Sequence, residues 1–450
     1  MDTTYELSDL DKAGFTKSVK VVLFYDLATA DSESVVSSFL EGVRNATRYL
    51  PFMAGHLQFT KSGKLCIVTS TDSSVDVNIC RFTSTECEPF SALAKDSFSP
   101  NELDLTRFLP EEPTANHPVC LVQLSLIHGG LVVGFRVNHA AGDWVSLDTF
   151  FSLVCQSSKA HEEGRSMPTY TLDGVDLKRV PYNTPAPDPT LSHQDRLAQL
   201  PLFHVIQKSQ FQFKPPPPTR AGIYRIAEPT IQQLKAQCTP YLDQVEYITS
   251  YDCISALIWI ALTRARLHLH PDQTNAPSRF VHPINVRSRD PEHKTSPQYF
   301  GNAVIGTLAG PIPAHTLIAN ENRSVAAAAS RIRQSIHAVD VSTIGHLTAL
   351  QASLADSEML LPNADFADMD LFMNTWYTGS AANYDLGGGT AGPVAFRVQA
   401  GMPGACAMIL PNLSGGASTK VFEVLVQASV LEYELLETDE QFLKYFEHVV

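Results

Sequence analysis

The hydrophobic pattern of the N-terminal third predicts strands and amphipathic helices in alternation. Val19 to Tyr25 is an apolar run of strand length, and Asp31 and Ser32 then offer an N-cap for a helix that Pro51 ends. Gly55 to Phe59 begins a further strand. Later apolar runs predict a hairpin and one more helix, with ranges Val119 to Ile127, Leu131 to Val137 and Trp144 to Cys155.

The pattern changes in the middle of the chain. From about Met167 to Thr219 proline and polar residues dominate, and four consecutive prolines favour an extended conformation. We therefore expect an α/β fold with an N-terminal domain over 1–185, a proline-rich crossover linker over 186–219 and a C-terminal domain over 220–450. The elements expected after the linker are strands at Ala221 to Ala227, Ala395 to Val398, Ala405 to Leu410 and Val421 to Val426, and helices at Ile231 to Cys238, from Thr249, at Ser324 to Ser353 and at Glu440 to His448.

Composition narrows the class of protein. The 450 residues are 44% hydrophobic and 18% charged, which is typical of a folded protein, and the formal net charge of −14 argues against nucleic acid or an anionic membrane as a general partner. The polar, acidic N-terminus is unlike a secretory signal, and no apolar run reaches the length of a transmembrane helix. The eight cysteines include no C-x-x-C pair, so we expect buried free thiols in a reducing, cytoplasmic compartment.

One histidine has a context suited to catalysis. Asn138-His139-Ala140-Ala141-Gly142-Asp143 follows the predicted hairpin, and the small residues leave space beside the imidazole, as a general base requires. The spacing alone is weak evidence, because His268 and Asp272 repeat it at the end of a predicted helix, where a solvated cation suits the helix dipole. On these residues alone, His139 is either a catalytic base or a structural histidine.

The remaining motifs mainly exclude types of binding or catalytic site. Gly387 to Gly392 matches G-x-G-x-x-G, but no apolar strand precedes it and Pro393 follows, so a dinucleotide site is rejected and a loop in close backbone contact is expected. No phosphate-binding P-loop, nucleophile elbow or metal-ligand spacing is found, so no metal is expected. A basic stretch, Arg264 to Lys294, is either a phosphate site or a solvated face.

Several stretches together resemble the BAHD family of acyl-CoA-dependent acyltransferases, and most closely its fungal branch, which includes trichothecene acetyltransferases. The His139 segment resembles the family's His-x-x-x-Asp motif, and Asn383-Tyr384-Asp385-Leu386-Gly387 stands where the family has Asp-Phe-Gly-Trp-Gly, with Leu386 and Gly388 as departures. The matches run in order along nearly the whole chain. The other matching stretches are Arg48 to Gly55, Thr249 to Trp259, Thr263 to Arg266, Ile284 to Arg289 and Tyr299 to Asn302.

The resemblance implies two similar mixed-sheet domains of the chloramphenicol acetyltransferase-like type, with a channel between them and acyl-CoA as co-substrate rather than a bound cofactor. It also implies that His139 takes a proton from a hydroxyl, or less readily an amine, of a specialised metabolite. Asp143 would orient the loop through Arg287 instead of relaying protons. The remaining implied roles are oxyanion donation by Asn374 and Trp376, loop support by Asp385 and Gly387, and acyl-CoA contact by Thr249, Ser250, Arg264 and Arg266.

Two alternatives stay beside this interpretation. A peptide-synthetase condensation domain is disfavoured, because its motif has a second histidine and a glycine where this chain has Asn138 and Trp144. The second alternative is a catalytically impaired relative that only binds a ligand. It is favoured by the changed residues in the loop from Asn383 to Gly392, called the glycine loop below, and disfavoured by the intact His139, Asp143 and Arg287 set. For the active enzyme we expect a monomer whose partners are acyl-CoA and a small acceptor, without nucleic acid or membrane.

Overall fold

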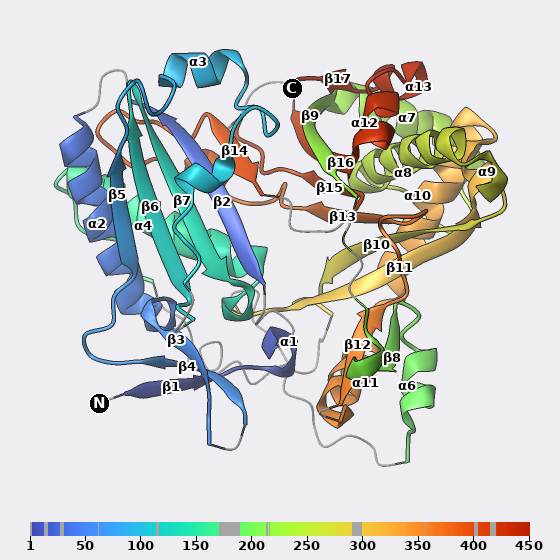
Figure 1. The fold of residues 1–450 in the computed structure, drawn as a ribbon, viewed down its shortest axis with the longest axis horizontal. Helices are drawn as coiled ribbons and strands as arrows, with labels where there is room; N and C mark the ends of the chain where they lie inside the picture. Colours follow the sequence, from blue (N-terminus) through green and yellow to red (C-terminus); the bar gives the residue numbers. More distant parts are fainter. Residues whose placement is uncertain are drawn as a thin grey trace.

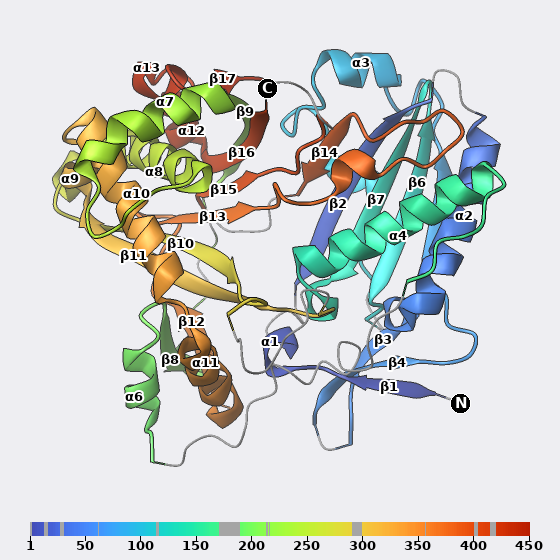
Figure 2. The ribbon, with the colours of Figure 1, turned by 180° about the vertical axis from the view of Figure 1, so that it is seen from behind.

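The protein is built in two halves, each formed around one β-sheet with helices against it (Figure 1). The computed structural model describes residues 2–12, 17–27, 31–61, 63–113, 117–170, 190–212, 215, 217–289, 299–355, 357–399, 404–414 and 420–450. The two sheets lie side by side, and segments from both halves meet between them (Figures 1 and 2).

The N-terminal half holds a five-stranded sheet in the order β14-β2-β7-β6-β5. Its long central strands pair antiparallel, and helices α2 and α4 lie together against one face (Figure 2). Buried apolar side chains fill the layer between sheet and helices. The bounds are β2 Ser18–Asp26, α2 Ser32–Tyr49, β5 Asp76–Arg81, β6 Cys120–Ile127, β7 Gly130–Asn138, α4 Trp144–Glu162 and β14 Ala395–Val398.

The C-terminal half holds a seven-stranded mixed sheet in the order β11-β10-β13-β15-β16-β9-β17. Its core packs around α8, whose Trp259 is fully buried, so this helix is apolar on nearly every side. The strands are β9 Thr219–Ala227, β10 Pro277–Asn285, β11 Val304–Pro313, β13 Leu371–Thr375, β15 Cys406–Ile409, β16 Val421–Ser429 and β17 Glu447–His448. The helices are α7 Glu228–Cys238, α8 Ser250–Leu269, α9 Ala314–Ile318, α10 Glu321–Ala338, α12 Val430–Leu436 and α13 Glu440–Leu443.

Smaller elements fill in around the two halves. A three-stranded sheet, β1-β4-β3, lies below the N-terminal half in Figure 1, and the β12-β8 pair lies below the C-terminal half with α6 and α11. The bounds are β1 Thr3–Glu6, α1 Asp9–Lys12, β3 His56–Phe59, β4 Leu65–Thr69, α3 Phe90–Lys95, α6 His193–Ala198, β8 Phe203–Gln207, α11 Val341–Ser353 and β12 Glu358–Pro362. Short 3-10 helices include η1 Pro51–Ala54, η2 Leu105–Phe108 and η3 His139–Ala141.

One strand crosses from the second half into the first. β14 comes from the region predicted as the C-terminal domain, yet it pairs antiparallel with β2 at the edge of the N-terminal sheet. The predicted linker is also structured, since α6 and β8 lie within it and β8 pairs with β12. The predicted boundary at residues 185 and 186, and linker residues 187–189, 213, 214 and 216, lie outside the described residues.

Most predicted elements are present within a few residues of their expected ends, and one is wrong. The helix predicted over Glu440 to His448 stops at Leu443, and Glu447 and His448 pair with β9 at the sheet edge. Sheet pairing has overridden the local helical pattern there. The eight cysteines are free and seven are buried, as predicted. Among the described residues, no helix combines the length and the apolar character that a membrane crossing requires.

Gly134 in β7 lets η2 pass directly over the strand that leads to His139. A Cβ atom placed on Gly134 would lie 1.8 Å from the carbonyl oxygen of Phe108, which is backbone and cannot swing away. We expect Gly134→Ala to lower the free energy of unfolding, measured by chemical denaturation, by about 1–3 kcal/mol or more.

Gly345 in α11 is the matched control, because a Cβ there would meet no atom within 4 Å. Gly345→Ala should leave stability unchanged or raise it by up to about 1 kcal/mol, since alanine favours a helix. Equal stability of Gly134→Ala and wild type would mean that η2 does not pack on β7 in this way.

Candidate active site

The loop that carries His139 is held by backbone and side-chain hydrogen bonds on both sides of this residue. β7 ends at Asn138, whose Oδ1 accepts from Ala140 N at 3.0 Å and starts η3. The His139 N–H donates to the carbonyl oxygen of Lys17 at 2.8 Å, and its carbonyl accepts from Asn302 Nδ2 at 2.7 Å. The backbone of His139 is therefore fixed from two directions.

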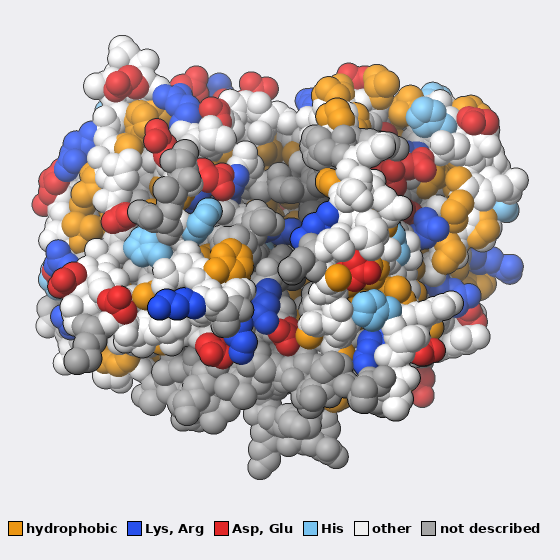
Figure 3. Space-filling view, turned by 60° about the horizontal axis from the view of Figure 1, so that its bottom comes forward, with side chains coloured by type: hydrophobic (Ala, Val, Ile, Leu, Met, Phe, Trp, Pro, Cys, Tyr) orange, Lys and Arg blue, Asp and Glu red, His pale blue; other side chains and the backbone are white. Residues whose placement is uncertain are grey.

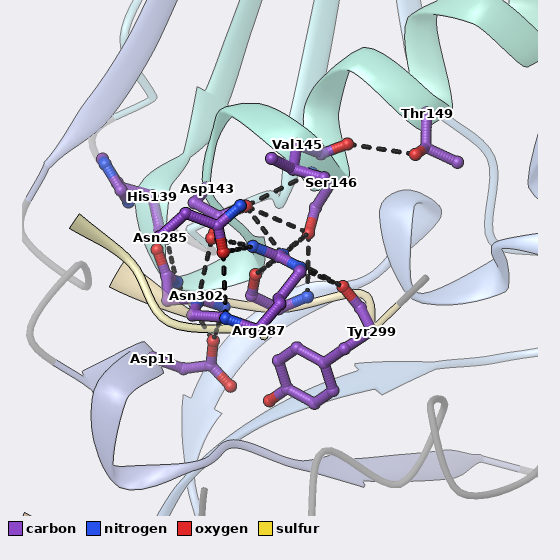
Figure 4. Close-up of polar contacts among 12 residues, drawn as sticks. Asp11, His139, Asp143, Val145, Ser146, Thr149, Asn285, Arg287, Tyr299 and Asn302 are labelled. Atoms are coloured by element: carbon purple, nitrogen blue, oxygen red, sulfur yellow. Dashed lines mark hydrogen bonds and ion pairs between the residues drawn. The ribbon is translucent and has the colours of Figure 1, made fainter. Parts of the chain in front are cut away.

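The imidazole of His139 is not part of that hydrogen-bonded support. Nδ1 is buried and has no hydrogen-bond partner among the described residues. In Figure 4 the ring points away from Asp143 and Arg287. The ring is thus presented by a rigid backbone, while its nitrogens are not used to hold the loop.

Asp143 and Arg287 form a bidentate ion pair that joins the two halves. Arg287 Nη1 lies 2.8 Å from Asp143 Oδ2, and Nη2 lies 2.9 Å from Oδ1. Both side chains are only 4% exposed. The same carboxylate accepts from Ala303 N at 2.9 Å and from Ser146 N at 3.3 Å, where it caps α4. The pairing that the family resemblance implied is present, and both oxygens of Asp143 face away from His139 (Figure 4).

Arg287 also binds the backbone that follows the basic stretch. Its guanidinium donates to the carbonyl oxygens of Tyr299 at 3.0 Å and Gly301 at 3.1 Å. Ser146 accepts from Arg287 at 3.1 Å and donates to the Gly301 carbonyl at 2.9 Å, so it connects α4 to the same turn. A buried arginine with this many partners is satisfied, and it holds residues 299–303 against the His139 loop.

Small residues and an aromatic contact bring these segments together. A Cβ on Gly142 would lie 2.7 Å from the Cβ of Ser146, so only glycine fits between η3 and α4. Phe300 packs on Phe52 of η1 with ring centroids 4.8 Å apart. Family-like stretches that are distant in sequence, Arg48 to Gly55, Ile284 to Arg289 and Tyr299 to Asn302, therefore meet around the His139 loop.

The end of β13 reaches the same place from the other side. Trp376 stacks on Trp144, the first residue of α4, with ring centroids 4.5 Å apart and planes 7° apart. Asn374 Oδ1 accepts from Thr375 N at 2.8 Å, so its side-chain NH2 is the group that can donate to a ligand. Both predicted oxyanion residues thus come from a strand whose end packs beside the His139 loop.

The glycine loop is tied to α4. Lys159 Nζ lies 2.5 Å from Asp385 Oδ2, and Gly387 N donates to Oδ1 at 2.8 Å. Burial raises the pKa of Asp385, but these two donors hold it below its ordinary value. Gly387 has φ +85°, and a Cβ there would lie 2.9 Å from the Cβ of Glu162. Close backbone contact is therefore the reason for glycine here, as the sequence predicted.

The N-terminus of α8 is occupied by its own cap. Thr249 donates its hydroxyl to Asp252 Oδ2 at 2.9 Å and accepts from Arg333 Nη2 at 2.7 Å. Ser250 is the first residue of the helix and is partly exposed. Behind them, burial lowers the pKa of His282 to about 3, so this ring stays neutral between Tyr251 and Ser335. Acyl-CoA contact by Thr249 and Ser250 stays a prediction.

Arg266 is buried and paired inside the protein, so its surroundings do not support the predicted acyl-CoA contact. It is 2% exposed, and its Nε donates to Glu432 at 2.7 Å. It also binds the carbonyl oxygens of Asp370 and Phe366.

Arg264 is held in the same way on the outer side of α8. Its Nε donates to Asp439 at 2.8 Å and its Nη1 to Gln441 at 2.7 Å, so the contact predicted for Arg264 is not supported either. Arg279 and Arg289 also bind inside the protein, the first to Asp370 and the second to backbone carbonyls. The described arginines of the basic stretch thus all have partners within the protein, and Lys294 lies outside the described residues.

Comparison with known proteins places the chain in a family. A sequence model of the Transferase family matches residues 1–435. The chain belongs to the BAHD transferases. This BAHD protein is 23% identical to acyltransferase cm3D of Cordyceps militaris over 98% of this chain and 96% of the relative. It is 22% identical to trichothecene 3-O-acetyltransferase TRI101 of Fusarium sporotrichioides, over 92% of this chain and 90% of the relative.

Solved structures confirm the two-domain BAHD fold. TRI101 of F. graminearum complexed with ethyl coenzyme A superposes with a TM-score of 0.81 at 20% identity, with full coverage of both chains. Vinorine synthase gives a TM-score of 0.69 at 16% identity, covering 98% of this chain and 94% of that one. The condensation enzyme VibH gives only 0.52 at 13% identity, covering 96% and 90%. The family match over residues 1–435 confirms the preference for the BAHD family over a condensation domain.

Residues that support the BAHD site were missed from the sequence. Ser146 gave no signal, because a serine in the first turn of a helix is common. Asp11 and the carbonyl of Lys17 were missed because their partners lie far along the chain. The available clue to Asp11 was its position three residues after Ser8, because a serine followed at that spacing by an acid resembles a capping box at a helix start.

Removing the arginine of the buried pair should be costly for folding. Arg287→Ala leaves the Asp143 carboxylate buried without its charge partner, so we expect the free energy of unfolding to fall by about 3–5 kcal/mol in chemical denaturation. Arg81→Ala is the control, because the Arg81–Glu33 pair is 54% and 65% exposed. That change should cost no more than about 1 kcal/mol. Equal losses in the two variants would contradict the supporting role of Arg287.

Proposed function

We propose that this BAHD enzyme transfers an acyl group from acyl-CoA to a hydroxyl group of a small metabolite, with His139 as the general base. The observation that carries the proposal is the position of His139, whose backbone is pinned while its ring stays outside the Asp143–Arg287 network (Figure 4). A general base needs this combination of fixed placement and an available ring nitrogen.

In the proposed reaction, His139 accepts the proton of the acceptor hydroxyl as its oxygen attacks the thioester carbonyl. A tetrahedral intermediate forms with negative charge on the former carbonyl oxygen. When the intermediate collapses, the carbon–sulfur bond breaks, the ester is released, and the proton on His139 passes to the CoA thiolate. Atoms and charge balance in this reaction without any metal or redox cofactor.

The negative oxygen of the intermediate requires a hydrogen-bond donor. Asn374 and Trp376 are our candidates, because the amide NH2 and the indole N–H both come from the strand end that packs on Trp144. Asp143 only orients the His139 loop, since its two oxygens are saturated by Arg287, Ala303 and the first turn of α4.

Substrates would approach between the two halves. The surface is hollowed between the two halves, and both cationic and acidic side chains lie near the hollow (Figure 3). Relatives named as O-acetyltransferases, such as astG of Aspergillus oryzae, favour an acetyl donor and a hydroxyl acceptor over an amine. A cytoplasmic monomer that binds neither nucleic acid nor membrane stays our prediction.

The altered glycine loop was the reason to consider a protein that binds ligand without catalysis. That loop is nevertheless anchored by Lys159 and packed on Glu162, so its changed residues have not detached it from α4. The His139 loop is likewise complete. Both features support an active enzyme.

His139→Ala removes the proposed base, so CoA release should slow by about 10²–10⁴-fold. The measurement is free thiol produced from acetyl-CoA with a panel of alcohols. His268→Ala is the matched control, because His268 has the same spacing to an acid but is exposed at the end of α8. Its rate should equal that of wild type. If His139→Ala releases CoA as fast as wild type with a good acceptor, the proposed base is wrong.

A further inference from the structure

Asp11 is a fully buried acid that the proposed reaction does not use directly. It lies in α1, near the N-terminus, and is 0% exposed. Oδ2 accepts from the backbone N–H of Ser8 at 2.9 Å and from its hydroxyl at 2.8 Å. Oδ1 accepts from Asn302 N at 2.7 Å and from Asn302 Nδ2 at 3.0 Å. Four donors from the described residues therefore bind this buried carboxylate.

Asn302 connects Asp11 to the backbone of His139. Its side-chain NH2 donates to Asp11 and also to the carbonyl oxygen of His139 at 2.7 Å (Figure 4). The side chain is 3% exposed. Both neighbours of the NH2 are acceptors, so the amide can take only one orientation, because the reversed amide would place its oxygen against two oxygens.

The charge on Asp11 makes the hydrogen bonds that connect it through Asn302 to His139 stronger than a neutral group would. Hydrogen bonds to a carboxylate are stronger than those between neutral groups. In a buried site, an amide polarised by one charged acceptor also donates better to a second acceptor. Asn302 is thereby both fixed in place and strengthened as a donor to the His139 carbonyl.

We propose that Asp11 is a positioning residue for catalysis, which acts through Asn302 to set the backbone of His139. The inference rests on the proposed role of His139 as base. The N-terminal segment then contacts the His139 peptide twice, through the Lys17 carbonyl at its N–H and through Asp11 and Asn302 at its carbonyl. Arg287 holds the far end of the same loop at Asp143, so the base is aimed by two independent anchors.

The test compares Asp11→Asn with Asn302→Ala in steady-state assays of CoA release. Asparagine has the size of aspartate but replaces one acceptor oxygen by a donor, so it cannot serve both Ser8 and Asn302. Because a small misplacement of a catalytic group is costly, kcat should fall about 10- to 100-fold in each variant. KM for acyl-CoA should stay within about two-fold of wild type, since neither residue is proposed to touch substrate.

The double variant distinguishes relay from general destabilisation. If Asp11 acts through Asn302, Asp11→Asn combined with Asn302→Ala should have the kcat of Asn302→Ala alone. Multiplied losses in the double variant would overturn the proposal. Asp9→Asn is the control on the same helix, because Asp9 pairs with Lys12 and should keep wild-type kcat.

The remaining outcomes separate this inference from the proposed function. If Asp11→Asn and Asn302→Ala keep wild-type kcat while His139→Ala is inactive, the inference fails and the base assignment stands. If His139→Ala is fully active, the proposed function fails first. Should Asp11→Asn not fold, wild-type kcat in Asn302→Ala would still overturn the inference, since Asp11 keeps both Ser8 donors in that variant.

Discussion

The buried ion pair of Asp143 and Arg287 is the interaction on which the rest of the site depends. A charge of either sign is expensive to bury, and each is stable here only because the other, with several backbone groups, surrounds it. Asp143 caps α4, the helix after the His139 loop, and Arg287 comes from the second half. The pair therefore joins the halves and orients the loop at the same time.

Other contacts across the junction extend the same arrangement. β14 adds a strand from the second half to the first sheet, the stacked pair Trp144 and Trp376 closes the space beside α4, and Lys159 ties the glycine loop to the end of that helix. Each contact fixes a different side of α4 or its loop. A base carried on such a support needs little reorganisation before it reacts, which is the condition for efficient proton transfer.

The sequence predicted what depends on local pattern and on ordered motifs. The central strands, α4, α8 and the family were predicted correctly, because hydrophobic period and motif order carry that information. Apart from the Asp143–Arg287 pair, which the family resemblance implied, long-range partners were not predicted: Arg266 is paired with Glu432, 166 positions away, and Asp11 with Asn302, 291 positions away. The strand at Glu447 was missed because pairing with β9 outweighs a helical pattern. Long-range partners are set by the fold and leave no local trace.

The most direct test of this account is the rate of CoA release by Asp143→Ala, Arg287→Ala and the double variant, measured under conditions where all are folded. If the pair only holds the loop, the two single variants lose similar factors of kcat and the double variant loses no more than the worse single variant. A much larger loss in Asp143→Ala than in Arg287→Ala would place Asp143 in proton transfer, and would contradict the account.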